Sequence, residues 1–188
     1  MRSPMRRRLI LSLLLFLALP FPASLVAQDD TVIFLVRHAE RADDAPADPG
    51  MAMAPQMMAQ DPPLSEAGKV RAELLAALLQ DAEITHIHST DYVRTKETAQ
   101  PTATATGLDL SVYDASDLEA FAKTLLATPG THLVVGHSNT TPALAEALGG
   151  NPGPPIQSLE YDRLYMVIPG GGKPRTVLLR FGELFGGR

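Results

Sequence analysis

Residues 31–40 read TVIFLVRHAE, and this stretch decides both the fold class and the place where a functional site is expected. The apolar run from 32 to 36 has the length and the β-branched content of a buried strand. Arg37 and His38 follow it directly, at the carboxyl end of the predicted strand. In α/β sheets, ligands bind outside that end of the strands. A solvated turn could carry the same two residues, so the hypothesis needs support from the rest of the chain.

Strand and helix patterns alternate along the remaining sequence. Strands are predicted at 84–88, 108–112 and 131–135, helices at 65–80, 92–106, 117–127 and 140–148, and a hairpin from 161–168 and 176–181. This alternation predicts an α/β three-layer sandwich, with a mainly parallel sheet covered by helices on both faces. The hairpin, joined through three glycines at 170–172, is expected on the sheet edge.

The helix at 65–80 has the clearest pattern. Ser65 stands where an N-cap is expected. Five apolar residues recur at helical spacing and are predicted to face the core: Val70, Leu74, Leu75, Leu78 and Leu79.

The first 27 residues have the three parts of a secretory signal peptide. Four arginines within residues 1–8 precede an apolar stretch at 9–19, and small residues lead to a cleavage position after Ala27. The apolar stretch is shorter than the roughly 20 residues that a membrane span needs. We therefore expect residues 28–188 to form a single exported domain, in a bacterial periplasm or outside the cell, without stable membrane association after cleavage.

Charge and cysteine content exclude several classes of protein. Residues 28–188 keep all 21 acidic residues and 12 of the 16 basic ones, a net charge of −9. This balance argues against nucleic acid or an anionic membrane as a partner. The chain has no Cys and therefore no disulfide framework. Arginines at strand ends in so acidic a chain call for a local anion, such as an anionic substrate.

Two later strands also end in residues suited to chemistry. Ser89 and Arg94 follow the strand at 84–88, and His137 follows the strand at 131–135. Arg94 falls in the first turn of a helix, where a cation opposes the helix dipole unless it shares an anion with the free amide groups. The carboxyl ends of parallel strands share one rim, so Arg37, His38, Arg94 and His137 are expected to meet there.

Two guanidinium groups and two imidazoles make a site for a tetrahedral dianion. Guanidinium forks match phosphoryl oxygens and stay charged at any relevant pH. A neutral imidazole can attack phosphorus while the cations neutralise charge on the equatorial oxygens. The arrangement predicts a small phosphorylated substrate and requires neither a metal nor a cofactor.

Three motifs now stand in order along the chain: RHAE at 37–40, STDYVRT at 89–95 with ETA at 97–99, and GHS at 136–138. As a set they resemble the histidine phosphatase superfamily, which has the phosphoglycerate mutase-like fold. The resemblance implies that His38 becomes phosphorylated and that Arg37, Arg94 and His137 hold the phosphoryl group. The length is similar to that of small members without large cap insertions.

The chain departs from that family in two places. Mutases of the family carry a Gly directly after the nucleophile and an Asn a few residues on, whereas this chain has Ala39 followed by Glu-Arg-Ala-Asp at 40–43. The family's acidic proton donor also has no clear counterpart. A phosphatase is therefore favoured over a mutase.

For the proton donor we predict Asp114, because it follows the strand at 108–112, where the family places its acid. An alkoxide leaving group needs such an acid. Asp117, Glu160 and Glu40 are the other candidates, although each could be a cap or a solvated carboxylate.

Two further functions remain open. His86 and His88 alternate on one strand and share a face, as ligands do in hydrolytic metal sites, but Asp91 is the sole carboxylate close to them in sequence. A phosphate-binding or phosphohistidine-reading module without turnover would carry the same rim residues.

The methionine-rich stretch at 41–63 is predicted to be a long loop, either a lid over the site or an insertion. Nothing in the sequence indicates the oligomeric state.

Overall fold

The computed structural model of the chain describes residues 31–44, 61–170 and 172–187. The predicted signal peptide at 1–27 lies outside these residues, as does most of the methionine-rich stretch at 41–63. The two described ends of that stretch meet, because the Ala42 amide donates a hydrogen bond to the Pro63 carbonyl at 2.9 Å. Within the described ranges, no helix is long and apolar enough to cross a bilayer.

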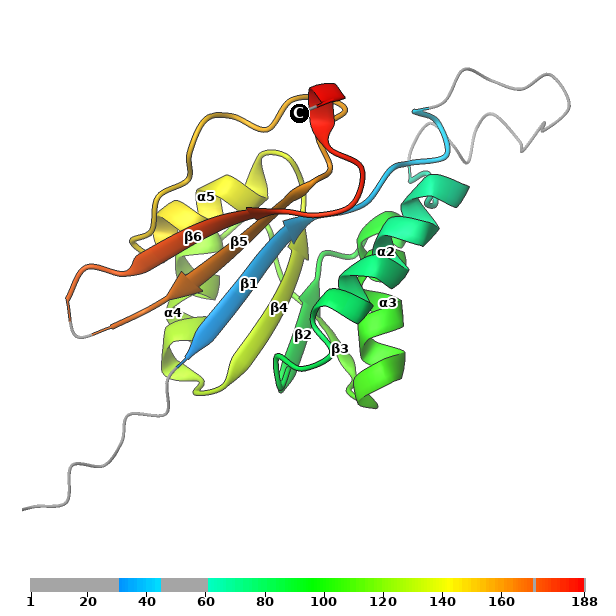
Figure 1. The fold of residues 1–188 in the computed structure, drawn as a ribbon. Coiled ribbons are helices and arrows are strands. Elements are labelled where there is room, and N and C mark those ends of the chain that lie inside the picture. Colours follow the sequence, from blue (N-terminus) through cyan, green and yellow to red (C-terminus); the bar gives the residue numbers. More distant parts are fainter. Residues whose placement is uncertain (1–30, 45–60, 171, 188) are drawn as a thin grey trace, which may run out of the picture.

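Six strands form one mixed sheet in the order β3-β2-β4-β1-β5-β6 (Figure 1). The strands are β1 (Val32–Arg37), β2 (His86–Ser89), β3 (Leu110–Val112), β4 (Thr131–Gly136), β5 (Arg163–Ile168) and β6 (Arg175–Arg180). The first four pair in parallel, whereas β5 is antiparallel to both β1 and β6. The predicted α/β fold with a mainly parallel sheet and an edge hairpin is confirmed, and β2 and β3 begin two residues later than expected.

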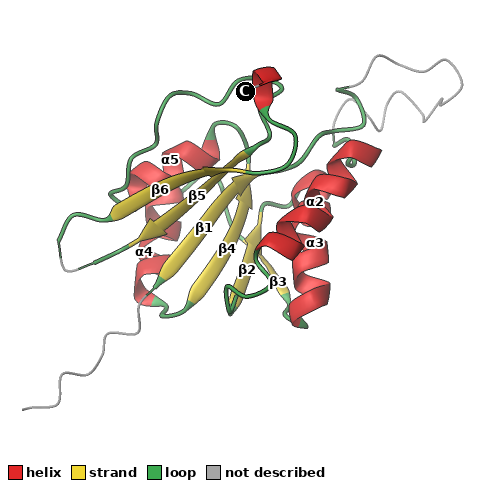
Figure 2. Cartoon of the chain, in the orientation of Figure 1, coloured by secondary structure: helices red, strands yellow, loops and turns green. Residues whose placement is uncertain are grey.

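Helices cover both faces of the sheet (Figure 2). The helices are α2 (Glu66–Leu78), α3 (Val93–Thr106), α4 (Leu118–Ala127) and α5 (Thr140–Ala147), with a 3₁₀ turn η1 (Phe185–Gly187) near the end. Alternate residues of β1 enter two separate cores, as a strand requires. Ile33 and Leu35 pack with α4 and α5, while Phe34 and Val36 pack with α2 and α3. The three-layer sandwich follows from this double burial.

Helix α2 confirms the predicted cap, since the Ser65 hydroxyl accepts from the Gly68 amide at 3.1 Å. The predicted core face was wrong for three of its five residues: Leu75 and Leu79 are buried, but Val70, Leu74 and Leu78 are exposed, Val70 by 69%.

The reason lies on the neighbouring face of the helix. Arg71 is buried there, and its NH2 contacts Glu40 Oε1 at 2.7 Å. Gly68 lies so close to the chain that an added Cβ would be 2.2 Å from the Glu40 carbonyl oxygen. An ion pair and a small residue, together with the buried Leu75 and Leu79, therefore set which face of the helix turns towards the segment after β1.

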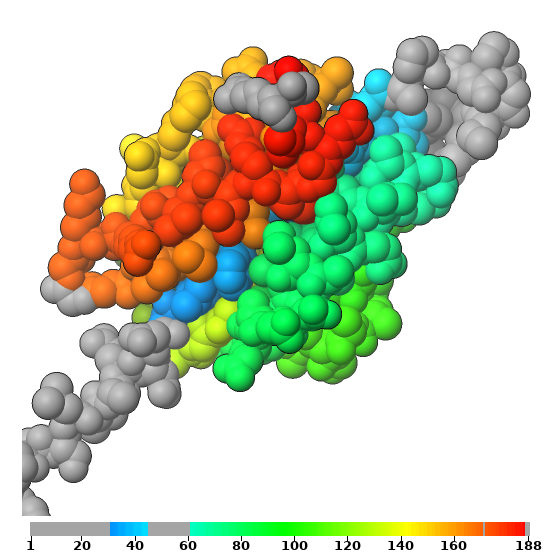
Figure 3. Space-filling view, viewed as in Figure 1, coloured from blue at the N-terminus to red at the C-terminus, as the bar shows by residue number. Residues whose placement is uncertain are grey.

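The C-terminal segment closes over this region, and Figure 3 shows it lying against α2. Arg71 also donates from NH1 to the Phe181 carbonyl at 2.7 Å and from NH2 to the Glu183 carbonyl at 3.0 Å. One buried arginine thus ties α2, the end of β1 and the chain after β6 together beside the rim.

Candidate active site

The two histidines are brought together by the register of β1 and β4. Arg37 is paired with Gly136 in the parallel ladder, so the residues that follow each strand become neighbours. The His38 amide donates to the Gly136 carbonyl at 2.9 Å. The ring centroids of His38 and His137 are 5.5 Å apart in an edge-to-face arrangement. The expected meeting of residues from different strand ends is seen in the structure.

His38 is held with a defined ring nitrogen free. Its Nδ1 lies 2.8 Å from the Ala39 carbonyl oxygen. A carbonyl only accepts, so Nδ1 carries the hydrogen and Nε2 keeps its lone pair. The pKa of His38 is lowered to about 3; burial is the largest cause, the charges of Arg37 and Arg94 add to it, and the hydrogen bond to the Ala39 carbonyl opposes it. The ring is neutral at pH 7 and has a lone pair with which to attack.

The segment after β1 is anchored to α3 through a threonine. The Ala39 amide donates to Thr98 Oγ1 at 3.0 Å, and the Thr98 hydroxyl donates to the Arg94 carbonyl at 2.7 Å. The ETA motif at 97–99 therefore has a structural explanation, because its threonine links the backbone beside His38 to the turn of helix that carries Arg94.

Arg37 is buried, and its guanidinium group is held mainly by backbone. NH1 donates to the carbonyls of Gln157 and Glu160 at 2.9 and 3.0 Å, and NH2 to the Tyr161 hydroxyl at 3.3 Å. The guanidinium carbon lies 4.0 Å from the centroid of the Tyr161 ring. Burial lowers the pKa of Arg37. Arginine nevertheless stays charged in proteins, so a fixed cation adjoins His38.

Arg94 lies in the first turn of α3, between an acid and an imidazole. Its NH1 is 3.2 Å from Asp61 Oδ1, and its NH2 is 3.5 Å from His137 Nδ1. Both Asp61 oxygens also accept from the Val93 amide, at 3.1 and 3.0 Å. The expected anion shared by Arg94 and the free amides of the helix is thus supplied by Asp61. No sequence pattern had singled out this residue.

His137 completes the rim. Its Nε2 lies 2.9 Å from Thr90 Oγ1, and its amide donates to Thr140 Oγ1 at the start of α5, at 2.8 Å. Burial lowers the pKa of His137 to about 4, and the charges of Arg94 and Arg37 act in the same direction. Both site histidines are therefore neutral near pH 7, next to two cations.

Two hydrogen-bond donors at the site have no acceptor within the described part of the chain. Arg37 Nε and Arg94 Nε are buried and have no hydrogen-bond partner among the described residues. A buried charged donor without a partner is unfavourable, and the oxygens of an anion are acceptors of the kind that these donors lack. The arrangement can therefore hold a tetrahedral oxyanion beside the His38 ring.

The predicted proton donor, Asp114, is fully exposed on the turn after β3. Its Oδ1 accepts from the amide and the hydroxyl of Ser116 at 2.8 and 2.7 Å. These hydrogen bonds lower the pKa of Asp114, whereas a proton donor needs a raised one. The role of Asp114 stays a prediction that substitution has to test.

The other acidic candidates are engaged in structural contacts. Asp117 Oδ1 caps α4 by accepting from the Ala120 amide at 3.0 Å. Glu40 is paired with Arg71. Burial by itself would raise the pKa of Glu160, but hydrogen bonds from Arg163, the Gln157 amide and Arg180 lower it to about 2.

The two histidines of β2 do share a face, as predicted, with nearly parallel rings 6.3 Å apart. They stack with His132 of β4, and His88 Nε2 lies 3.2 Å from His132 Nδ1. In the part of the chain that the structure describes, no group of three or more His, Asp or Glu side chains is placed to hold a metal ion. His86 and His88 belong to a stack of imidazoles away from the rim.

Comparison with known proteins places this geometry in context. A sequence profile of the histidine phosphatase superfamily (branch 1) matches residues 33–119, which include His38 and Arg94. A search of curated protein sequences found no significant match. His137 lies beyond the matched range, so its place in the site rests on the geometry above.

Several solved structures share the fold. A protein from Agrobacterium tumefaciens assigned as the phosphohistidine phosphatase SixA is 26% identical, with a TM-score of 0.56 over 81% of this chain and 99% of that one. A mycobacterial glucosyl-3-phosphoglycerate phosphatase is 16% identical, with a TM-score of 0.62 over 81% of this chain and 100% of that one. A tungstate complex of the protein histidine phosphatase SixA is 18% identical, with a TM-score of 0.58 over 79% and 96%.

Proposed function

The chain belongs to the histidine phosphatase superfamily, and we propose that it hydrolyses phosphomonoesters through a phosphohistidine formed on His38. One observation carries the proposal: the unprotonated Nε2 of a neutral His38 adjoins Arg37 and Arg94, whose buried Nε atoms have no hydrogen-bond partner among the described residues. An attacking nitrogen and the donors for the phosphoryl oxygens are thus in one place. Neither step of the proposed reaction requires a metal.

The first step is attack of His38 Nε2 on phosphorus. A nitrogen–phosphorus bond forms, the bond from phosphorus to the leaving oxygen breaks, and that oxygen takes up a proton. Arg37 and Arg94 neutralise the charge on the remaining oxygens. The ring becomes positively charged as it is phosphorylated, and the Ala39 carbonyl, 2.8 Å from Nδ1, stabilises that charge. Water then attacks the phosphohistidine, which releases phosphate and restores His38.

In the proposed reaction, the substrate displaces Asp61 from its contacts with Arg94 and the Val93 amide. Its carboxylate contacts the same guanidinium group that the phosphoryl oxygens would bind, and also the Val93 amide at the start of α3. A dianion with more acceptor oxygens competes for these donors. Because Asp61 adjoins Arg94, which is proposed to bind the phosphoryl oxygens, it joins Asp114 as a candidate for the proton donor.

Release of phosphate from an aryl phosphate tests the proposal. Wild type, His38→Ala and His88→Ala are each assayed with and without a chelator. Chelator-resistant release that disappears in His38→Ala supports the proposal. Release that the chelator abolishes, and that survives in His38→Ala but not in His88→Ala, would instead indicate a metal hydrolase. Oxyanion binding without any release would indicate a binding module.

Export is a separate proposal, supported by the arginines and the apolar stretch of residues 1–27. We propose that the protein acts in the periplasm or outside the cell after cleavage following Ala27. Sequencing the N-terminus of the protein from a bacterial host tests this. A start near Gln28 is expected, and an intact Met1 on a membrane-bound form would contradict it.

A further inference from the structure

Arg37 owes its position to one short turn of backbone. Both of its NH1 contacts are carbonyl oxygens, of Gln157 and of Glu160, more than a hundred residues away in sequence. The Glu160 amide donates to the Gln157 carbonyl at 3.1 Å and closes the turn at 157–160. The direction of the guanidinium group, whose Nε has no partner among the described residues, is therefore set by where this turn and the adjoining Tyr161 lie.

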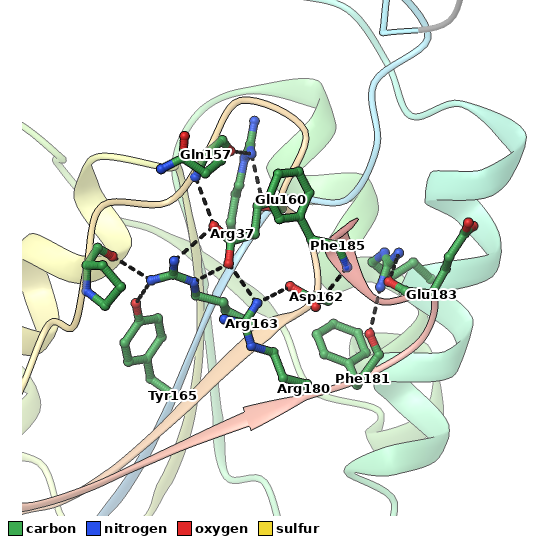
Figure 4. A network of polar contacts seen from close by, with 12 residues as sticks. Arg37, Gln157, Glu160, Asp162, Arg163, Tyr165, Arg180, Phe181, Glu183 and Phe185 are labelled. Atoms are coloured by element: carbon green, nitrogen blue, oxygen red, sulfur yellow. Dashed lines mark hydrogen bonds and ion pairs between the residues drawn. The ribbon is translucent and has the colours of Figure 1, made fainter. Parts of the chain in front are cut away.

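The side chain of Glu160 holds that turn from inside the protein (Figure 4). It is 2% exposed and accepts four hydrogen bonds. Oε2 accepts from the Gln157 amide and from Arg163 NH2, both at 2.9 Å, and Oε1 from Arg163 Nε at 2.7 Å and Arg180 NH1 at 2.6 Å. The same residue thus offers its carbonyl to Arg37 and fixes that carbonyl through its carboxylate.

Arg163 links Glu160 to the segment that precedes the turn, at Pro154 and Pro155. Its NH1 donates to the Pro154 carbonyl at 2.6 Å and its NH2 to the Pro155 carbonyl at 3.2 Å, and its side chain is 4% exposed. Between α5 and β5 the chain forms no helix or strand, so these contacts take the place of regular hydrogen bonding. We call Glu160 and Arg163 the Glu160 cluster.

A buried ion pair is weak evidence for stability, because desolvation offsets much of its attraction, but it can specify one geometry. We propose that the Glu160 cluster positions Arg37 for binding of the phosphoryl group, with Glu160 and Arg163 as positioning residues that do not touch the substrate. This inference rests on the proposed function, since it assigns Arg37 to the phosphoryl oxygens.

Glu160→Gln tests the inference, because it keeps the size of the side chain and removes its charge. Asp162→Asn is the matched control: Asp162 is equally buried and contacts Arg180 and the Phe185 amide, but not the turn at 157–160. Tungstate affinity, kcat and KM for an aryl phosphate, and unfolding in urea are measured for each variant, alone and combined with Arg37→Ala.

We expect Glu160→Gln to weaken tungstate binding and lower kcat/KM by about tenfold, and Asp162→Asn to leave both unchanged. In the Arg37→Ala background the effect of Glu160→Gln should disappear, because Glu160 acts through Arg37. A residue with a merely structural role would show the same loss in both backgrounds. Arg163→Lys keeps the positive charge but loses the forked guanidinium group that binds both Glu160 oxygens. It is expected to show the same losses as Glu160→Gln and replaces that variant if Glu160→Gln does not fold.

Two results overturn different statements. If wild type binds tungstate and hydrolyses the ester, but the loss in Glu160→Gln is absent or persists in the Arg37→Ala background, the positioning role is refuted. If wild type neither binds tungstate nor releases phosphate, the proposed function itself fails. The same set of proteins therefore distinguishes the two failures.

Discussion

Replacing Arg94 by alanine removes one of the two guanidinium groups whose Nε atoms lack a partner. Loss of one donor to transition-state charge typically lowers kcat by about 10²- to 10³-fold, or ~3 to 4 kcal/mol. Arg94 also lowers the pKa of His38, but burial is the larger cause, so the pKa in the variant is expected to rise while staying below its ordinary value. At pH 7 His38 therefore stays neutral, and the loss does not arise from protonation of the nucleophile.

The assay is the pH dependence of kcat and KM for a nitrophenyl phosphate between pH 4 and 8. Arg94→Ala should lose kcat at pH 7, and the acid limb of kcat/KM, which the pKa of about 3 places below this range in wild type, should move towards it. Arg175→Ala, at an exposed position of β6, is the control for a lost surface charge and should match wild type. A raised KM at unchanged kcat would refute the reasoning, since Arg94 would then bind ground state and transition state equally.

Three further predictions concern protonation. His137 is neutral when the site is empty, and a dianion beside it favours its charged form, so phosphate should bind with proton uptake and more tightly as the pH falls. Calorimetry in buffers of different ionisation enthalpy measures this, and no uptake would contradict it. Burial lowers the pKa of His88 to about 4 and also lowers that of His132, so the unfolded chain binds more protons between about pH 6.5 and 4. The free energy of unfolding, measured in urea, should therefore be highest above pH 6.5 and should decrease as the pH falls below 6.5, by up to about 1.4 kcal/mol per pH unit for each histidine. The decrease should be less steep in His88→Gln, and equal free energies at pH 7.5 and 5 would count against this prediction. Finally, Asp114→Asn and Asp61→Asn should separate the donor candidates, because loss of the donor slows an alkyl phosphate strongly and spares a nitrophenyl ester, and equal effects on both esters would remove that residue from the role.

The rim was predictable because it depends on topology. Parallel strands end at one edge, so the residues directly after β1, β2 and β4 were expected on one rim, whereas the adjacency of β1 and β4 became known only from the structure. The pairing of Arg37 with Gly136 then places His38 beside His137 without any long-range signal in the sequence. The fold class followed for the same reason, from the alternation of apolar strands and amphipathic helices.

What holds the rim was not predictable. Arg37 donates to backbone carbonyl oxygens, which every residue has, so its partners could not be recognised from their residue types. Asp61 reaches Arg94 from a segment without periodicity. Three residues of α2 were assigned to the core because they recur at helical spacing, but the ion pair of the buried Arg71 with Glu40 turned another face inward.

The local pattern around Asp114 did contain a usable signal. An aspartate two residues before a serine commonly accepts from the backbone amide at that position. The hydrogen bonds from Ser116 are of this kind, and they keep the carboxylate ionised. A turn at this place could have been expected from residues 114–116 alone.

Trapping of the covalent intermediate tests the central claim most directly. The protein is mixed with a ³²P-labelled phosphomonoester, quenched in alkali within the first turnover, and digested to locate the label. We expect a phosphohistidine, stable in alkali and labile in acid, on His38 Nε2, formed at the rate of turnover and absent in His38→Ala. Turnover without a labelled protein, or a label on any residue other than His38, would contradict the account.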